Sequence, residues 1–165
     1  MEMEQILKEA VAYQTNLVEV TGGEPLLQAA CASLLTQLCD LGKQVLLETS
    51  GERDISVVDI RVHRIVDFKA PASGESHRNR WDNIDHLNRN DEVKLVIQDR
   101  NDYEWAKSII REHALNERVK DVWLSPVHGV MPADALVTWM LKDELKARVQ
   151  LQIHKYIWGP NVRGV

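Results

Sequence analysis

The feature that most constrains this chain is the regular alternation of short apolar runs with longer segments of helical periodicity. The apolar runs have the length and composition of β-strands, and helical patterns separate several of them. We predict six strands, at residues 17–20, 44–48, 64–68, 93–98, 121–124 and 149–153. The helical patterns cover residues 2–14, 25–41, 102–115 and 132–146.

This alternation predicts a parallel sheet, because parallel strands need crossover connections and helices supply them. Unbroken apolar runs such as Val45-Leu46-Leu47 further indicate a sheet that is covered on both faces. We therefore expect an α/β fold with about six parallel strands, arranged as an open sheet or a partial TIM-type β/α barrel. A single domain over residues 1–165 is expected to contain all of them.

Charge and hydropathy exclude several classes of partner. The net charge of -5 and the pI near 5.7 give no general attraction to nucleic acid or to anionic membrane surfaces. No apolar run approaches the roughly 20 residues that a membrane span requires, and the first residues do not resemble a secretory signal. We expect a cytoplasmic protein that binds neither nucleic acid nor membranes.

The two cysteines, Cys31 and Cys39, lie within the helical pattern at residues 25–41 and on a similar face of it. Their separation is too large for a disulfide within a regular helix. We interpret both as small core residues rather than as redox or metal-binding groups.

Polar residues and glycines recur where the predicted strands end. Because parallel strands deliver their carboxyl ends to one edge, these groups are expected to meet there, and the glycines allow a ligand to approach the backbone. Any single group is explained as well by helix capping or loop solvation; the whole set favours a ligand site. The segments are Thr21-Gly22-Gly23-Glu24-Pro25, Glu48-Thr49-Ser50-Gly51, Asp67-Phe68-Lys69-Ala70-Pro71, Ser125-Pro126-Val127-His128-Gly129 and His154-Lys155-Tyr156-Ile157-Trp158-Gly159-Pro160.

These segments carry a family resemblance. The Gly22-Gly23-Glu24 turn resembles the segment with which radical S-adenosylmethionine enzymes bind the amino group of the methionyl moiety. The Glu48-Thr49-Ser50-Gly51 segment, the stretch from Val66 to Glu75 and the tail from His154 to Pro160 are similar to 7-carboxy-7-deazaguanine synthases. The resemblance extends over nearly the whole chain from Leu17 onward.

The resemblance implies a reaction and a set of cofactors. Such enzymes convert 6-carboxy-5,6,7,8-tetrahydropterin to 7-carboxy-7-deazaguanine, on the route to queuosine, and use a [4Fe–4S] cluster, S-adenosylmethionine and Mg²⁺. The resemblance also implies two groups of binding residues. The residues implied for S-adenosylmethionine are Gly22, Gly23, Glu24, Ser50, Asp67 and Lys69. The residues implied for the pterin-derived substrate are Gly22, Glu48, His154 and Pro160. A carboxylate and an imidazole suit the N–H donors and the acceptors of a pterin edge.

The sequence departs from the family in one respect. The Cys-x-x-x-Cys-x-x-Cys loop that holds the iron–sulfur cluster is absent from the 165 residues, and Cys31 and Cys39 have the wrong spacing for it. We expect a radical S-adenosylmethionine core without its first strand, its cluster loop and its Mg²⁺-binding residue. We therefore assign no catalytic or metal-binding residue, and expect this chain alone to be inactive.

Three other functions stay open. The chain is interpreted alternatively as a non-catalytic protein that binds S-adenosylmethionine or a purine, as one subunit of a split enzyme, or as an activating enzyme for a glycyl-radical protein. The last class shares the Gly-Gly-Glu turn, but the tail from His154 to Pro160 argues against it. A missing edge strand would leave backbone groups unpaired, so we expect a homodimer or a complementing chain.

Overall fold

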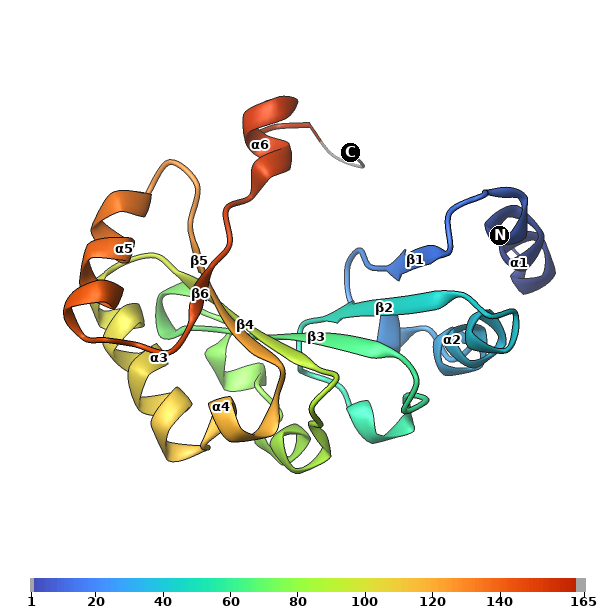
Figure 1. The fold of residues 1–165 in the computed structure, drawn as a ribbon, viewed down its shortest axis with the longest axis horizontal. Helices are drawn as coiled ribbons and strands as arrows, with labels where there is room; N and C mark the ends of the chain where they lie inside the picture. Colours follow the sequence, from blue (N-terminus) through green and yellow to red (C-terminus); the bar gives the residue numbers. More distant parts are fainter. Residues whose placement is uncertain (1, 163–165) are drawn as a thin grey trace.

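The computed structural model describes residues 2–162 and contains one six-stranded parallel sheet in the order β1-β2-β3-β4-β5-β6 (Figure 1). The strands are β1 (Leu17–Val20), β2 (Gln44–Thr49), β3 (His63–Phe68), β4 (Glu92–Ile97), β5 (Asp121–Pro126) and β6 (Arg148–Val149). All five strand pairs are parallel, which confirms the predicted α/β fold. Within residues 2–162 the pairs run from β1 to β6 without a pair that closes the sheet into a barrel.

Helices connect the strands. The α-helices are α1 (Met3–Ala12), α2 (Cys31–Asp40), α3 (Arg100–Glu112), α4 (Leu115–Arg118), α5 (Ala133–Lys142) and α6 (Ile153–Ile157). Short 3₁₀ helices occupy the loops, at η1 (Pro25–Leu27), η2 (Ile55–Val57), η3 (Pro71–Ser73), η4 (Ser76–Arg78) and η5 (Trp81–His86). None of the helices in the described residues is both long and apolar enough to cross a membrane.

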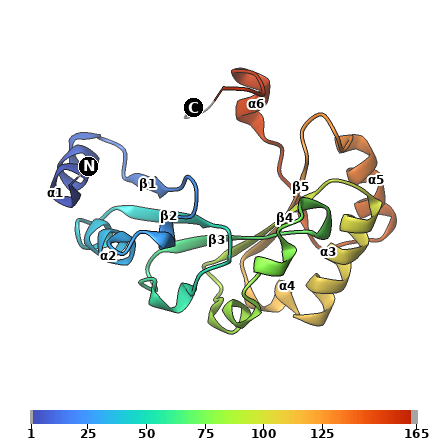
Figure 2. The same cartoon turned by 180° about the vertical axis from the view of Figure 1, so that it is seen from behind.

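Within residues 2–162, one face of the sheet is packed against helices and the other is not, which corrects the expectation of two covered faces. Burial alternates along β2, β3 and β4, so that each second side chain is buried and those between are half-buried or exposed. In the run Val45-Leu46-Leu47, Val45 and Leu47 are buried and Leu46 is not. The views from both sides place α3 and α4 beneath the sheet (Figures 1 and 2). The other face, which we call the open face, is therefore available to polar side chains.

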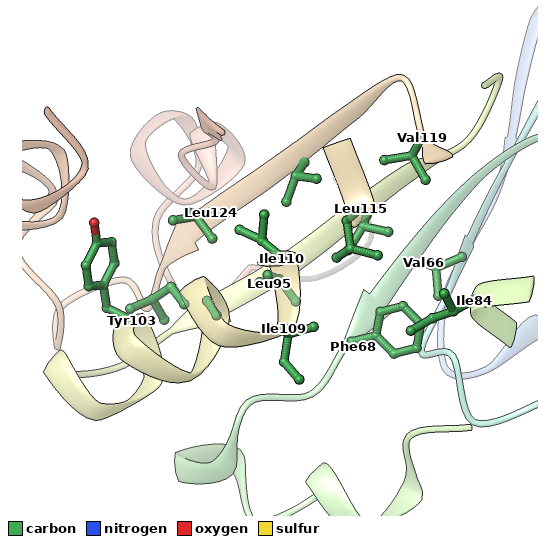
Figure 3. Packing of buried hydrophobic residues seen from close by; sticks show 14 of the residues in the cluster. Val66, Phe68, Ile84, Leu95, Tyr103, Ile109, Ile110, Leu115, Val119 and Leu124 are labelled. Atoms are coloured by element: carbon green, nitrogen blue, oxygen red, sulfur yellow. The ribbon is translucent and has the colours of Figure 1, made fainter. Parts of the chain in front are cut away.

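The covered face forms the hydrophobic core in two clusters. The larger cluster contains Tyr103, Ile109 and Ile110 of α3 together with Leu95 of β4 and Leu124 of β5 (Figure 3). The smaller one packs α2 beneath β2 and includes Cys31, while Cys39 is half-buried against it. Both cysteines are reduced, and both contribute to packing as predicted.

Two predicted elements are shorter than the sequence pattern indicated. The helical pattern at residues 25–41 is divided into η1 and α2, because the Glu24 carboxylate caps a 3₁₀ turn that begins at Pro25. The predicted strand at residues 149–153 is wrong beyond Val149: β6 has two residues, and Ile153–Ile157 is the helix α6. Because β6 lies at the edge of the sheet and pairs with β5 alone, few hydrogen bonds hold the following residues extended.

Candidate active site at the strand ends

The carboxyl ends of β1, β2 and β3, together with Ile65 and Lys94 from within β3 and β4, surround a small cavity of about 90 Å³ on the open face. It is lined by Thr21, Gly23, Glu48, Thr49, Ser50, Ile65, Asp67, Lys69 and Lys94, and we call it the strand-end pocket. Five of the residues predicted from the sequence are among these: Gly23, Glu48, Ser50, Asp67 and Lys69. Their convergence follows from the parallel register, in which each strand contributes its last residues to the same edge.

A second cavity of about 380 Å³ adjoins the strand-end pocket and shares Gly23, Ser50 and Lys69 with it. Its other walls come from Glu24, Leu27, Glu52, Glu75 and Arg78. Arg78 forms ion pairs with Glu52 and Glu75, so the loop after β3 is tied across the end of β2. The two cavities together form one hollow that runs from the open face to the loops.

In the Gly22-Gly23 turn, Gly23 lines this hollow, whereas Gly22 lines a separate cavity beside α1 and α2. Gly22 has a φ of 95° and Gly23 a φ of 59°, which are conformations that L side chains rarely adopt. A Cβ atom at either position would have no other atom within 4 Å, so the space beside the turn is open. Glycine is therefore required here for conformation, and the open space leaves the backbone accessible to a ligand.

The Glu24 carboxylate joins the end of β1 to the end of β2. It accepts hydrogen bonds from Leu26 N at 3.0 Å, Thr49 Oγ1 at 2.9 Å and Ser50 N at 2.7 Å, and also from the Ser50 hydroxyl. Both oxygens are thus engaged by the protein itself. In this structure Glu24 fixes the turn that presents Gly22 and Gly23, and its direct contact with S-adenosylmethionine stays a prediction.

Glu48 lies on β2 and points into the strand-end pocket. Thr21 Oγ1 donates to its Oε2 at 3.2 Å, and Lys94 Nζ lies 3.4 Å from its Oε1. The side chain is 34% exposed, so its carboxylate remains open to a ligand. Glu48 can accept N–H donors without losing its internal contacts, because a carboxylate has about four acceptor positions.

Asp67 carries a buried oxygen without a partner. Lys69 Nζ donates to Asp67 Oδ2 at 2.9 Å, whereas Oδ1 is buried and accepts no hydrogen bond from residues 2–162. Burial raises the pKa of Asp67 above its usual value, against the opposing effect of Lys69 and Lys94. Asp67 lines the strand-end pocket, and a buried acceptor without a partner is a position where an added donor would be stabilised.

Comparison with known proteins identifies the family. The chain is 44% identical over 168 residues to the 7-carboxy-7-deazaguanine synthase of Chlorobaculum tepidum, and the match covers 100% of this chain and 76% of that protein. This chain belongs to the 7-carboxy-7-deazaguanine synthase family. Identity to the synthase of Koribacter versatilis is 43%, over 91% of this chain and 72% of the relative. Identity to the synthase of Clostridium acetobutylicum is 34%, over 96% of this chain and 75% of the relative.

Two other comparisons concern family models and solved structures. No family model matches the chain. Among solved structures, Streptococcus suis SuiB superposes with a TM-score of 0.58 at 12% sequence identity, over 90% of this chain and 42% of SuiB. At that identity the likeness concerns the fold alone, and it agrees with the six-stranded parallel sheet described above.

The tail of this synthase-family chain lies apart from the strand-end pocket. His154 was expected at the end of a strand beside Gly23, Glu48 and Lys69, but it lies on α6, and it is not among the residues that line the pocket. Figure 1 shows α6 projecting away from the sheet on the open side. The tail contacts the loop after β5 through the His128 and Tyr156 rings, whose centroids are 5.0 Å apart. Substrate contacts of His154 and of the exposed Pro160 stay predictions.

Sequence reasoning assigned no role to four residues that line the pocket, Thr21, Thr49, Ile65 and Lys94, and it also overlooked the neighbouring Glu19. The register pairs Asp67 with Lys94, and side chains on one face of a strand recur at every second position. Burial, with the charge of Glu48, raises the pKa of Glu19, and Lys94 opposes this. Strand periodicity would have placed Lys94 on the same face as Glu92, but not beside Glu48.

The residues that this chain offers do not suit an iron–sulfur cluster. Burial raises the pKa of both Cys31 and Cys39, which disfavours the thiolate form that binds iron. Both lie on α2, which packs on the covered face of the sheet. Within the described residues, no group of three or more His, Cys, Asp or Glu side chains has a geometry suited to a metal ion.

Proposed function

We propose that this chain provides the S-adenosylmethionine and pterin sites of a 7-carboxy-7-deazaguanine synthase. The reaction assigned to it is the conversion of 6-carboxy-5,6,7,8-tetrahydropterin to 7-carboxy-7-deazaguanine in queuosine biosynthesis. The observation that carries this proposal is the convergence of Gly23, Glu48, Ser50, Asp67 and Lys69 on one pocket in a chain that is 44% identical to a curated synthase.

The hollow at the strand ends fits S-adenosylmethionine. The open Gly22-Gly23 backbone suits the polar methionyl end, and the unpaired Asp67 Oδ1 suits an N–H or O–H donor. Ser50 and Lys69 line both cavities. When bound, S-adenosylmethionine supplies the hydrogen-abstracting group of the reaction, and the residues of this chain bind and orient it.

The substrate is assigned to the Glu48 side of the same pocket. A pterin edge presents neighbouring N–H donors, which a carboxylate accepts in pairs. Gly22 is proposed to contact the substrate through its backbone. His154 and Pro160 are proposed to contact it from the tail, in a bound form in which α6 lies closer to the pocket than in Figure 1.

Calorimetric titration tests the two sites directly. We expect S-adenosylmethionine and the carboxypterin each to bind the isolated chain at one site. D67N is expected to weaken the binding of S-adenosylmethionine more than the binding of the pterin, and E48Q is expected to have the opposite effect. N116D, on α4 at the covered side, serves as a control outside the pocket. Absence of binding for both ligands would refute the proposal.

We further propose that the chain by itself performs no radical chemistry, because its two cysteines do not suit the cluster. Anaerobic reconstitution with iron and sulfide is expected to leave the chain without a [4Fe–4S] absorption or Mössbauer signal. The synthase of Chlorobaculum tepidum, treated in parallel, provides the positive control. A stoichiometric cluster that cleaves S-adenosylmethionine would contradict this part of the proposal.

The free edge of β1 is the proposed site for a partner chain. Within residues 2–162, β1 pairs with β2 alone, and Leu17 at its start is 50% exposed. A complementing chain that carries a cluster segment would add to this edge; a homodimer is the second possibility. Adding the amino-terminal segment of a curated relative in trans distinguishes the complementing chain from the homodimer. Restored turnover would support a split enzyme. Binding without turnover would support a non-catalytic binding protein instead.

A further inference from the structure

Lys94 lies at the centre of the charged groups of the open face. Its side chain is 16% exposed and lines the strand-end pocket, and its Nζ is 3.4 Å from Glu48 Oε1. Among the described residues Glu48 is its one hydrogen-bond partner, although an ammonium group has three donors. A lysine held in this way is oriented toward the pocket rather than toward solvent.

One carboxylate contacts this ammonium group, and the charge of Lys94 acts on two others. Glu48 is in direct contact with it, Asp67 is its partner in the β3–β4 register, and the charge of Lys94 also acts on Glu19 of β1. Glu92, two residues earlier on β4, is engaged elsewhere, by Trp123 Nε1 at 2.9 Å. Lys69, the other cation of the pocket, contacts Asp67 and not Glu48. Among the described residues, Lys94 is therefore the cation that contacts Glu48, and its charge also acts on Glu19.

We propose that Lys94 is a positioning residue for the substrate: it fixes the Glu48 carboxylate toward the pocket and balances the negative charge of Glu19, Glu48 and Asp67. The expected effect on substrate binding rests on the proposed function, because Glu48 is the group assigned to the pterin edge. Thr21 assists from the other side by donating to Glu48 Oε2. Together the two donors hold one carboxylate between β1 and β4.

The charge arrangement is tested without any ligand. Carbon-13 titration of the side-chain carboxyl groups by NMR reports Glu19 and Asp67 separately. K94M removes a charge that lowers the pKa of both, so both midpoints are expected to rise. K69M is the matched comparison, because Lys69 lowers the pKa of Asp67 and is not among the charges that act on Glu19. Unchanged midpoints in K94M, or equal effects of K94M and K69M on Glu19, would overturn the assignment.

The consequence for binding is tested with the carboxypterin. K94M is expected to weaken its affinity about tenfold, the lower range for the loss of a hydrogen bond to a charged group. K94R, which keeps the charge, is expected to restore most of the affinity, and K142M on the exposed end of α5 is expected to have no effect. Affinity equal to the unmodified chain in K94M, or no recovery in K94R, would refute the positioning role. If the unmodified chain does not bind the pterin, the proposed function fails, and the titration alone decides on Lys94.

Discussion

Replacing Glu24 with alanine tests whether this residue acts through the turn or through a ligand. The carboxylate accepts four hydrogen bonds, from Leu26 N, Thr49 Oγ1, Ser50 N and the Ser50 hydroxyl. A hydrogen bond to a charged group contributes about 1.5–3 kcal/mol, but these four share one half-buried side chain and water replaces part of them. We expect E24A to lower the free energy of unfolding by about 3 kcal/mol.

That loss is large enough to measure by two methods. For a domain of this size, 3 kcal/mol corresponds to a decrease in Tm of about 6–12 °C. Urea unfolding gives the free energy, and hydrogen exchange at the Leu27 and Gln28 amides, which donate to Glu24 O and Pro25 O, reports the turn itself. E24Q keeps one acceptor oxygen and brings an amide group toward Leu26 N or Ser50 N, so an intermediate loss of about 1–2 kcal/mol is expected.

The outcomes separate two roles for Glu24. If the side chain acts by holding the turn, E24A loses stability, amide protection and S-adenosylmethionine affinity together. If E24A keeps its stability within about 0.5 kcal/mol and keeps normal amide exchange, the hydrogen bonds of the Glu24 carboxylate do not hold the turn. Should such a variant nevertheless lose S-adenosylmethionine binding, direct contact between Glu24 and the ligand would replace the positioning role.

Three further predictions concern other parts of the molecule. D91A leaves the guanidinium of Arg64, which is 4% exposed, without its ion-pair partner, so urea unfolding is expected to show a loss of about 3–5 kcal/mol, with recovery in R64M/D91L; equal losses in the single and double variants would contradict this. G51A combines a φ of 72° with a Cβ atom 3.1 Å from Val66, so its Tm is expected to fall further than that of G42A, where φ is 77° and the space is open; equal shifts would argue against crowding at Gly51. The raised pKa of Asp67 means that its favourable contribution is present below its unfolded pKa near 3.8 and is lost as the pH rises through the folded value. Relative to the unmodified chain, D67N is therefore expected to gain stability as the pH rises from about 3 through the folded pKa of Asp67, and a constant difference in the free energy of unfolding would refute the assignment.

Periodicity in the sequence was sufficient to predict the order of elements. The apolar runs at residues 17–20, 44–48 and 64–68 are strands, since β-branched and apolar residues bounded by glycine or polar turns favour that conformation. Parallel pairing was inferred from the helices that separate several of the strands, and the meeting of Gly23, Glu48 and Lys69 followed from extending that pairing to the third strand. These are local or topological properties, which a sequence pattern reports directly.

Other properties depended on contacts between distant residues. The sequence of the tail predicted a strand as far as Ile153, but strand formation needs a neighbour, and β6 has a partner on one side only. The apolar run Val45-Leu46-Leu47 predicted burial on both faces of the sheet, but Leu46 is not buried. A run of apolar residues does not reveal on which face of the sheet a helix packs. The sequence alone determined which groups reach the strand ends. The tertiary structure decided that Lys94 stands beside Glu48, 46 residues away in sequence, because that proximity arises from the register of strands and not from any local pattern.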